Sequence, residues 1–370
     1  MKGAWRKAAV AVGTAMLAAS VLSGCNASKS VIEKPDKTIT VIDKREKTGE
    51  ELQTGEIEVS HIETLEGARG MDWLGEDRLI IDRENRNFEP QSVEGELRYV
   101  RNLYIKNMSG ETPILEEKRN QGFAEVSPDG KYLFFKRYVE ATSTGVIMNL
   151  ETKEAAKLGD DIIPISEGRW TPEGRLIFPD MRGTIYLADP DGKLTRLFKA
   201  ETYVLSHVVK QGSVVYYIMG DNSDLYAYDV ETREEKKLVN GAFRIEPSPD
   251  GKHLALVLKA DQSDTEKSLV VADPQGNTTK VVATGTEIYG TAWSPDGNSL
   301  AYNLVSEREG GLKGLFVADM TTGKTTQIAV DLQYATDKLR WSPSGKKLMS
   351  STFVPGENGY TFRTYIISFK

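Results

Sequence analysis

Ionisable side chains recur at one position of a repeated pattern in this sequence. The position lies just before a tryptophan, or before the residue that stands in its place, within segments that are otherwise apolar. In chain order, its occupants are Asp72, Glu125, Arg169, His207, Glu246, Ala292 and Arg340. Six of these seven residues are ionisable. If the strands that carry them line a central channel, the six side chains form a ring of mixed charge.

Two interpretations of this ring are open. In the first, the acids and arginines pair with one another and with channel water, because a lone buried charge is costly. In the second, the six residues hold a polar ligand or a cation at the channel mouth. We favour the first interpretation and keep the six residues as candidate ligand positions.

Other residue types that carry chemistry are sparse. The three histidines, His61, His207 and His253, stand on separate segments and lack a metal-ligand spacing such as H-E-x-x-H. No G-x-S-x-G sequence occurs, which disfavours serine hydrolase chemistry. Four aspartates end predicted strands and are typical turn formers: Asp189, Asp229, Asp273 and Asp319. We therefore predict no catalytic residue, no metal and no cofactor.

A repeated turn places the charged positions. It is complete in Trp293-Ser294-Pro295-Asp296-Gly297, which leads into an apolar segment. Proline pre-sets φ at the second turn position, aspartate favours the third, and glycine accepts the left-handed conformation that follows. The last turn residues of the seven copies stand at positions 77, 130, 174, 212, 251, 297 and 345, so consecutive copies are 38 to 53 residues apart. This spacing is close to the length of one four-stranded propeller blade.

The repeat predicts an all-β domain over residues 55–370. A second hairpin follows the first in six of the units, and no segment has sustained helical periodicity. We therefore predict a seven-bladed β-propeller, with six blades as the alternative because the copies that end at positions 77 and 212 are degenerate. Four tryptophans share one motif position and are predicted to pack between blades: Trp73, Trp170, Trp293 and Trp341.

The last repeat lacks one strand. After Trp341 it offers two strand-like segments, residues 348–353 and 364–369. Residues 56–62 form a further strand-like segment ahead of the first repeat, and no repeat claims it. We predict that this segment completes the last blade and so closes the ring.

The W-S-P-D-G turn, followed by an apolar strand and then by a Y-L-A-D or F-V-A-D strand, resembles the TolB-like propeller repeat over about residues 55–370. It is similar also to the propellers of prolyl-oligopeptidase relatives. The resemblance implies a protein-binding platform, a substrate gate or, in some members, an enzyme. Some TolB-like lyases hold a metal through a histidine cluster in the channel, for which only His207 is placed here. TolB carries a second domain before its propeller, which we do not expect in this chain, so TolB's role is not carried over.

The N-terminal residues are predicted to direct the protein to the envelope and not to join the fold. Lys2, Arg6 and Lys7 precede an apolar stretch over residues 8–22, which is short for a membrane span and typical of a secretory signal. We predict a lipoprotein signal peptide over residues 1–24.

The signal ends in a motif that can accept lipid. Leu22-Ser23-Gly24-Cys25 resembles the lipobox of bacterial lipoproteins, and Cys25 is the only cysteine of the chain. Acyl chains such as palmitate on Cys25 would anchor the protein to a membrane. Residues 25–54 are polar and charged, and we predict that they form a flexible tether.

Charge and address together suggest a class of partner. Loss of residues 1–24 removes three positive charges and changes the formal net charge from −7 to −10. An acidic chain without a basic stripe disfavours nucleic acid as a partner. We predict a lipoprotein on the extracytoplasmic face of a bacterial membrane that binds an envelope protein, a peptide or a glycan. The alternative is an enzyme, a propeller lyase or lactonase that acts through His207 and the channel acids.

Overall fold

The computed structural model describes residues 29–34, 37–42, 57–93, 95–139, 142–159, 162–202, 205–260, 265–308, 310–329, 337–356 and 359–370. The chain divides into two compact units, residues 1–46 and residues 47–370. All regular structure in the described ranges is β-strand. These ranges contain no helix long and apolar enough to cross a membrane. The predicted signal peptide and Cys25 lie outside the described residues.

The first unit contains one antiparallel hairpin. Its strands are β1 (Lys29–Lys34) and β2 (Lys37–Ile42), with Ile32 opposite Ile39. Both strands fall within residues 25–54, the segment predicted to be a tether. The two apolar pairs of that segment, at residues 31–32 and 41–42, are therefore part of a strand pair.

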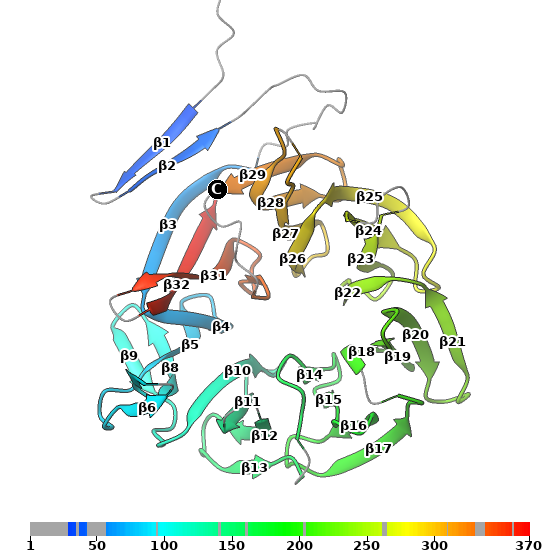
Figure 1. Ribbon diagram of the computed structural model, residues 1–370, viewed down its shortest axis with the longest axis horizontal. Coiled ribbons are helices and arrows are strands. Elements are labelled where there is room, and N and C mark those ends of the chain that lie inside the picture. Colours follow the sequence, from blue (N-terminus) through cyan, green and yellow to red (C-terminus); the bar gives the residue numbers. More distant parts are fainter. Residues whose placement is uncertain are drawn as a thin grey trace, which may run out of the picture. The chain divides into compact units, whose positions relative to one another are not determined.

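The second unit is a ring of seven four-stranded antiparallel sheets, which confirms the predicted seven-bladed β-propeller and excludes the six-bladed alternative (Figure 1). From the innermost strand outward, blade 1 contains β4 (Ala68–Gly75), β5 (Arg78–Glu84), β8 (Arg101–Asn107) and β9 (Gly110–Pro113); blade 2 contains β10 (Asn120–Val126), β11 (Tyr132–Val139), β12 (Thr142–Asn149) and β13 (Ala155–Lys157); and blade 3 contains β14 (Arg169–Trp170), β15 (Leu176–Pro179), β16 (Thr184–Ala188) and β17 (Leu194–Lys199).

The ring continues in the same order. Blade 4 contains β18 (Leu205–Gln211), β19 (Val214–Met219), β20 (Asp224–Asp229) and β21 (Glu235–Val239); blade 5 contains β22 (Ala242–Pro247), β23 (Leu254–Lys259), β24 (Lys267–Ala272) and β25 (Thr278–Gly285); and blade 6 contains β26 (Glu287–Trp293), β27 (Ser299–Val305), β28 (Lys313–Asp319) and β29 (Thr325–Ala329). A short hairpin, β6 (Gln91–Val93) and β7 (Glu96–Arg98), is inserted between the second and third strands of blade 1.

Blade 7 joins the two ends of the propeller. It contains β30 (Arg340–Trp341), β31 (Lys347–Gly356), β32 (Gly359–Phe369) and, outermost, β3 (Val59–Glu66). Ile62 of β3 lies opposite Ile367 of β32, and the backbone N–H of Lys370 donates to the carbonyl of Glu58 at 3.0 Å. The predicted closing strand is thus confirmed, three residues later in the chain than expected.

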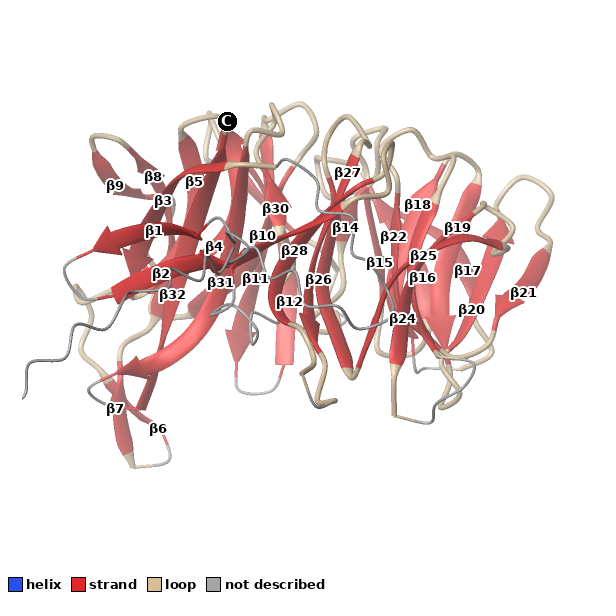
Figure 2. Cartoon of the chain, turned by 90° about the horizontal axis from the view of Figure 1, so that it is seen from above, coloured by secondary structure: helices blue, strands red, loops and turns tan. Residues whose placement is uncertain are grey.

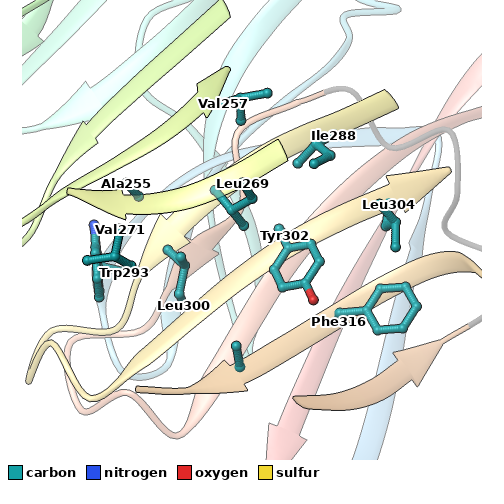
Figure 3. Packing of buried hydrophobic residues seen from close by; sticks show 11 residues of the cluster. Ala255, Val257, Leu269, Val271, Ile288, Trp293, Leu300, Tyr302, Leu304 and Phe316 are labelled. Carbon is teal, nitrogen blue, oxygen red and sulfur yellow. The ribbon is translucent and has the colours of Figure 1, made fainter. Parts of the chain in front are cut away.

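Apolar residues pack between neighbouring blades. Leu269 and Val271 of blade 5 belong to one buried cluster with Trp293 and Tyr302 of blade 6 (Figure 3). The rings of Tyr302 and Phe316 stack with centroids 5.6 Å apart. Burial of each such side chain contributes about 1.5–3 kcal/mol, so each blade depends on its neighbours for much of its core.

The four motif tryptophans also bond across the blade boundaries. Each indole N–H donates to a backbone carbonyl of the preceding blade: Trp73 to Arg340 at 2.9 Å, Trp170 to Glu125 at 2.9 Å, Trp293 to Glu246 at 3.0 Å and Trp341 to Ala292 at 3.1 Å. Every acceptor is the residue at the charged position of its own blade. The tryptophans therefore fix the strands that carry the candidate ring.

Candidate functional site at the propeller axis

Five of the six predicted ring residues occupy equivalent places on the innermost strands. Asp72, Glu125, Arg169, Glu246 and Arg340 each pair with the second core residue of the next strand in their blade. Because each inner strand continues through a turn into the second strand, this shared register puts the five side chains at one level around the axis.

His207 does not belong to this level. In blade 4, Val209 pairs with Tyr216 and takes the equivalent place, while His207 stands two residues earlier in a bulge with φ at 53°. The offset arises from the turn, because blade 4 has a tight hairpin after Gln211, whereas blades 2, 5 and 6 have the longer S-P-D-G turn. Counting back from the turn therefore misplaced the histidine by two residues.

A second level of polar residues lies two positions before the first. The second level contains Glu167, His207, Arg244 and Lys338, with Gly70, Phe123 and Gly290 in the remaining blades. The sequence analysis missed Glu167, Arg244 and Lys338, although counting two residues back from each charged position would have found them.

On one side of the axis, one arginine serves two acids. Arg340 Nη1 lies 2.8 Å from Glu125 Oε1, and its Nε lies 4.0 Å from Asp72 Oδ1. Burial raises the pKa of Asp72, and Arg340 opposes that rise. Burial also acts to raise the pKa of Glu125, but Arg340, Lys338 and Arg169 hold it below its usual range. Both acids thus depend on Arg340.

On the other side, two cations share one acid. Arg169 Nη1 lies 2.7 Å from Glu246 Oε2, and Lys338 Nζ lies 2.9 Å from Glu246 Oε1. Burial acts to raise the pKa of Glu246, but Lys338 and Arg169 lower it to about 2. Burial and the nearby Arg169 lower the pKa of Lys338 to about 8.

Three carboxylates also accept backbone N–H groups of the next blade. Asp72 accepts from Val126 at 2.8 Å and Glu125 accepts from Trp170 at 3.1 Å. Glu167, which is 1% exposed, accepts from the backbone N–H groups of His207 and Val208 in blade 4, at 2.8 and 3.0 Å. These acids therefore tie blade 1 to 2, blade 2 to 3 and blade 3 to 4. The structural interpretation of the ring accounts for them.

The environment of His207 keeps its imidazole neutral. Burial comes first among the causes, and repulsion by Arg169, Arg244 and Lys338 adds to it, which lowers the pKa of His207 to about 3. Among the described residues, no group of three or more His, Cys, Asp or Glu side chains could hold a metal ion. Binding through charge and hydrogen bonds is one chemistry that this arrangement can perform.

One end of the propeller carries most of the exposed apolar side chains. The inner strands all begin at this end, which we call the entry end, and the S-P-D-G turns lie at the other. Of nine large exposed hydrophobic residues in the described ranges, seven lie on strands or loops at the entry end: Leu97, Ile162, Ile165, Met181, Phe243, Phe353 and Tyr360. We call these seven residues the apolar face. Figure 2 shows β6 and β7, which carry Leu97, projecting from the end opposite the C-terminus.

Two arginines of blade 1 hold the hairpin of β31 and β32 in place. Arg69 and Arg101 both stand over the ring of Phe362, at 4.9 and 4.7 Å from its centroid, and Phe362 packs on Phe353 at 4.4 Å. Arg69 also bonds both carboxylate oxygens of Asp337, at 2.8 and 2.7 Å. The aromatic part of the apolar face is therefore fixed against blade 1.

A buried lysine holds another part of the apolar face. Lys136 is fully buried, and its ammonium donates to the carbonyls of Pro164 and Ile165 at 2.5 and 2.7 Å and stands 4.1 Å from the ring centroid of Phe123. Burial lowers the pKa of Lys136 to about 7. This lysine fixes the loop that also supplies Glu167.

Comparisons with known proteins agree on the fold. An oligogalacturonate lyase in complex with manganese matches with a TM-score of 0.59 at 13% identity, covering 93% of this chain and 96% of the lyase. An oligogalacturonate lyase from Vibrio parahaemolyticus matches with a TM-score of 0.58 at 12% identity, covering 92% and 96%. TolB from Acinetobacter baumannii gives a TM-score of 0.47 at 15% identity, covering 79% and 64%. No protein-family profile and no curated protein matches the sequence. The chain has the β-propeller fold.

Replacement of Arg340 tests the first ion-pair group. We expect Arg340→Leu to lower the free energy of unfolding by about 3–5 kcal/mol in urea titrations at pH 7, because it leaves two buried carboxylates without their cation. Arg363→Leu is the matched control, since Arg363 pairs with Glu66, whose side chain is 60% exposed, and should cost less than about 1 kcal/mol. Equal losses in the two variants would contradict the assignment.

The depressed pKa of Lys136 predicts a pH dependence of stability. Between pH 7 and 9 the unfolded chain keeps the lysine proton more firmly than the folded chain, so the free energy of unfolding rises with pH. Across this range, we expect the free energy of unfolding of the wild type to rise by about 2 kcal/mol more than that of Lys136→Met, measured by urea unfolding. Lys131→Met, at an exposed lysine, should follow the wild type. Parallel curves for the wild type and Lys136→Met would refute the prediction.

Proposed function

We propose that the protein is a lipid-anchored binding protein of the bacterial envelope, whose propeller engages an envelope protein, a peptide or a glycan. The apolar face carries this proposal. Seven of the nine large exposed hydrophobic residues gather at one end, and gathered exposed apolar area is typical of interaction sites. The charges at the axis, by contrast, are largely engaged in holding blades together.

The rigidity of the apolar face supports recognition of a partner. Its aromatic hairpin is fixed by Arg69 and Arg101, and its loop at Ile165 is fixed by Lys136. A surface that is ordered before binding loses less conformational entropy when a partner binds. Tyr360, 80% exposed, is the most accessible aromatic side chain of the set.

The position of the closing strand supports the anchor. Val59 pairs with Phe369, whose N–H donates to Lys346 beside the turn of blade 7, so the chain joins the propeller at the turn end. The apolar face lies at the opposite end of the blades. Lipid on Cys25 would hold the protein on the membrane, and the chain would enter the propeller at the end away from the apolar face.

A second candidate function is a propeller lyase or lactonase that acts through His207 and Glu246. The neutral imidazole of His207 close to Glu246 favours it, because a neutral imidazole can accept a proton. The binding function is preferred, since Glu246 already bonds both Arg169 and Lys338. Turnover of a defined substrate that His207→Ala abolishes would replace the binding proposal.

Capture from envelope membranes tests the binding function. We expect Tyr360→Ser and Leu97→Ser to reduce recovery of the cross-linked partner about tenfold or more, because each removes exposed apolar contact at the proposed interface. Met108→Ser and Val281→Ser are the matched controls, since these residues are 91% and 60% exposed but lie outside the apolar face. Recovery that falls equally in all four variants, or in none, would contradict the proposal.

Replacement of Cys25 tests the anchor. In cells that express the full chain, we expect the wild type to sediment with membranes and to incorporate labelled palmitate. Cys25→Ala should lose the label and leave the membrane fraction after an alkaline wash, because the acyl chains supply the membrane affinity. Ser23→Ala keeps the thiol and should behave as the wild type. A Cys25→Ala protein that still resists the wash would disprove lipid anchoring at this residue.

A further inference from the structure

We propose that Arg169, Arg244 and Lys338, at the entry end of the propeller axis, form a binding site for an anionic group, a carboxylate or a phosphate, of the ligand. The proposal rests on the binding function above and names the chemistry that the ligand must present. It depends on an arginine without a carboxylate partner among the described residues, on a local excess of positive charge and on partial exposure of the cations near the apolar face.

Arg244 has no carboxylate partner among the described residues. Its described aromatic neighbour is Tyr289, whose ring centroid lies 6.0 Å from the guanidinium carbon. Within the described ranges, no carboxylate lies within 4.0 Å of the guanidinium, although Arg244 is only partly exposed. Burial, followed by repulsion from Arg169, lowers the pKa of Arg244. A partly buried charge without a counterion is costly, and a bound anion would relieve that cost.

The neighbouring acids offset this charge only in part: Glu287 and Glu246 act to raise the pKa of Arg244, yet burial and Arg169 hold it below its usual value. Arg169 and Lys338 share the single carboxylate of Glu246. Together with Arg244, three cations therefore stand near this one carboxylate. Glu167 is buried, and both of its oxygens accept backbone N–H groups. The other acids of the region serve cations of their own: Glu125 pairs with Arg340, and Glu287 pairs with Lys267. The excess of positive charge is therefore centred on Arg244.

His207 lies within the same electrostatic environment. Arg169, Arg244 and Lys338 all act on it, and with burial they keep its imidazole uncharged at neutral pH. A neutral imidazole retains one N–H donor. Two guanidinium groups, an ammonium and an imidazole N–H are together donors suited to an oxyanion, and guanidinium groups can bind one in a bidentate way.

The cations of the site are partly exposed to solvent. The side chains of Arg169 and Lys338 are 18% and 26% exposed. Arg244 follows Phe243 directly, and Phe243 is part of the apolar face at 40% exposure. A ligand could therefore rest an apolar portion on the face and direct its acidic group toward Arg244.

Titration with small anions tests the site. We expect inorganic phosphate and succinate to raise the thermal unfolding midpoint of the full chain at constant ionic strength set with sodium chloride, because a ligand that binds only the folded state stabilises it. Arg244→Gln should weaken binding at least tenfold by calorimetry, and Arg244→Lys should retain part of it. Arg78→Gln, at the turn end, removes the same charge and should bind as the wild type. A preference for phosphate or for succinate identifies which oxyanion the ligand carries.

The outcomes separate this proposal from the binding function. If Arg244→Gln binds both anions as the wild type does, if Arg78→Gln loses as much affinity, or if neither anion binds the wild type, the anion site is wrong. The binding function would still stand if Tyr360→Ser loses partner capture in that case. Equal unfolding midpoints of wild type and Arg244→Gln without anion would show that the variant is folded. If the midpoints differ, anion binding by Arg244→Lys is compared with that of the wild type instead.

Discussion

The propeller depends on hydrogen bonds that cross between neighbouring blades beside the axis. Indole N–H groups reach back to carbonyls of the preceding blade, as Trp170 does to Glu125, and carboxylates reach forward to N–H groups, as Asp72 does to Val126. These are groups that would be costly to bury without partners. The same residues therefore set the spacing of the blades and the placement of charge at the axis. Most of the ring's charge is structural for this reason.

The two ends of the blades have different properties as a consequence. At the turn end, Ser–Asp side-chain bonds such as Ser294 to Asp296 at 2.6 Å close compact, polar turns. At the entry end, longer connections carry the apolar face, held by Lys136 and by the arginines around Phe362. At this end also lies Arg244, a cation of the axis with no described carboxylate within 4.0 Å of its guanidinium. The features that suit recognition thus coincide at one end of the fold.

Local patterns in the sequence predicted most of the fold, because turn chemistry and strand propensity act within a few residues. The blade count, the interblade tryptophans and the closing strand all followed from them. The site was harder to predict. The tight hairpin after Gln211 shifted the register of blade 4, so His207 was assigned to the wrong level. Pairs such as Arg169 with Glu246 join residues 77 positions apart, and nothing in the local sequence reports which partners meet across the axis.

The closing strand has a consequence for how the protein becomes folded. Ser60 of β3 bonds to the carbonyl of Ser368, across a sequence separation of 308 residues. The first strand of the propeller to be synthesised, β3, therefore cannot pair in its blade until the last strand, β32, has been made. Until β32 has been made, β3 has no partner strand and can pair with other chains, and contacts of such long range form slowly. The chain would need protection from edge-to-edge association for the whole interval between its first and last blade.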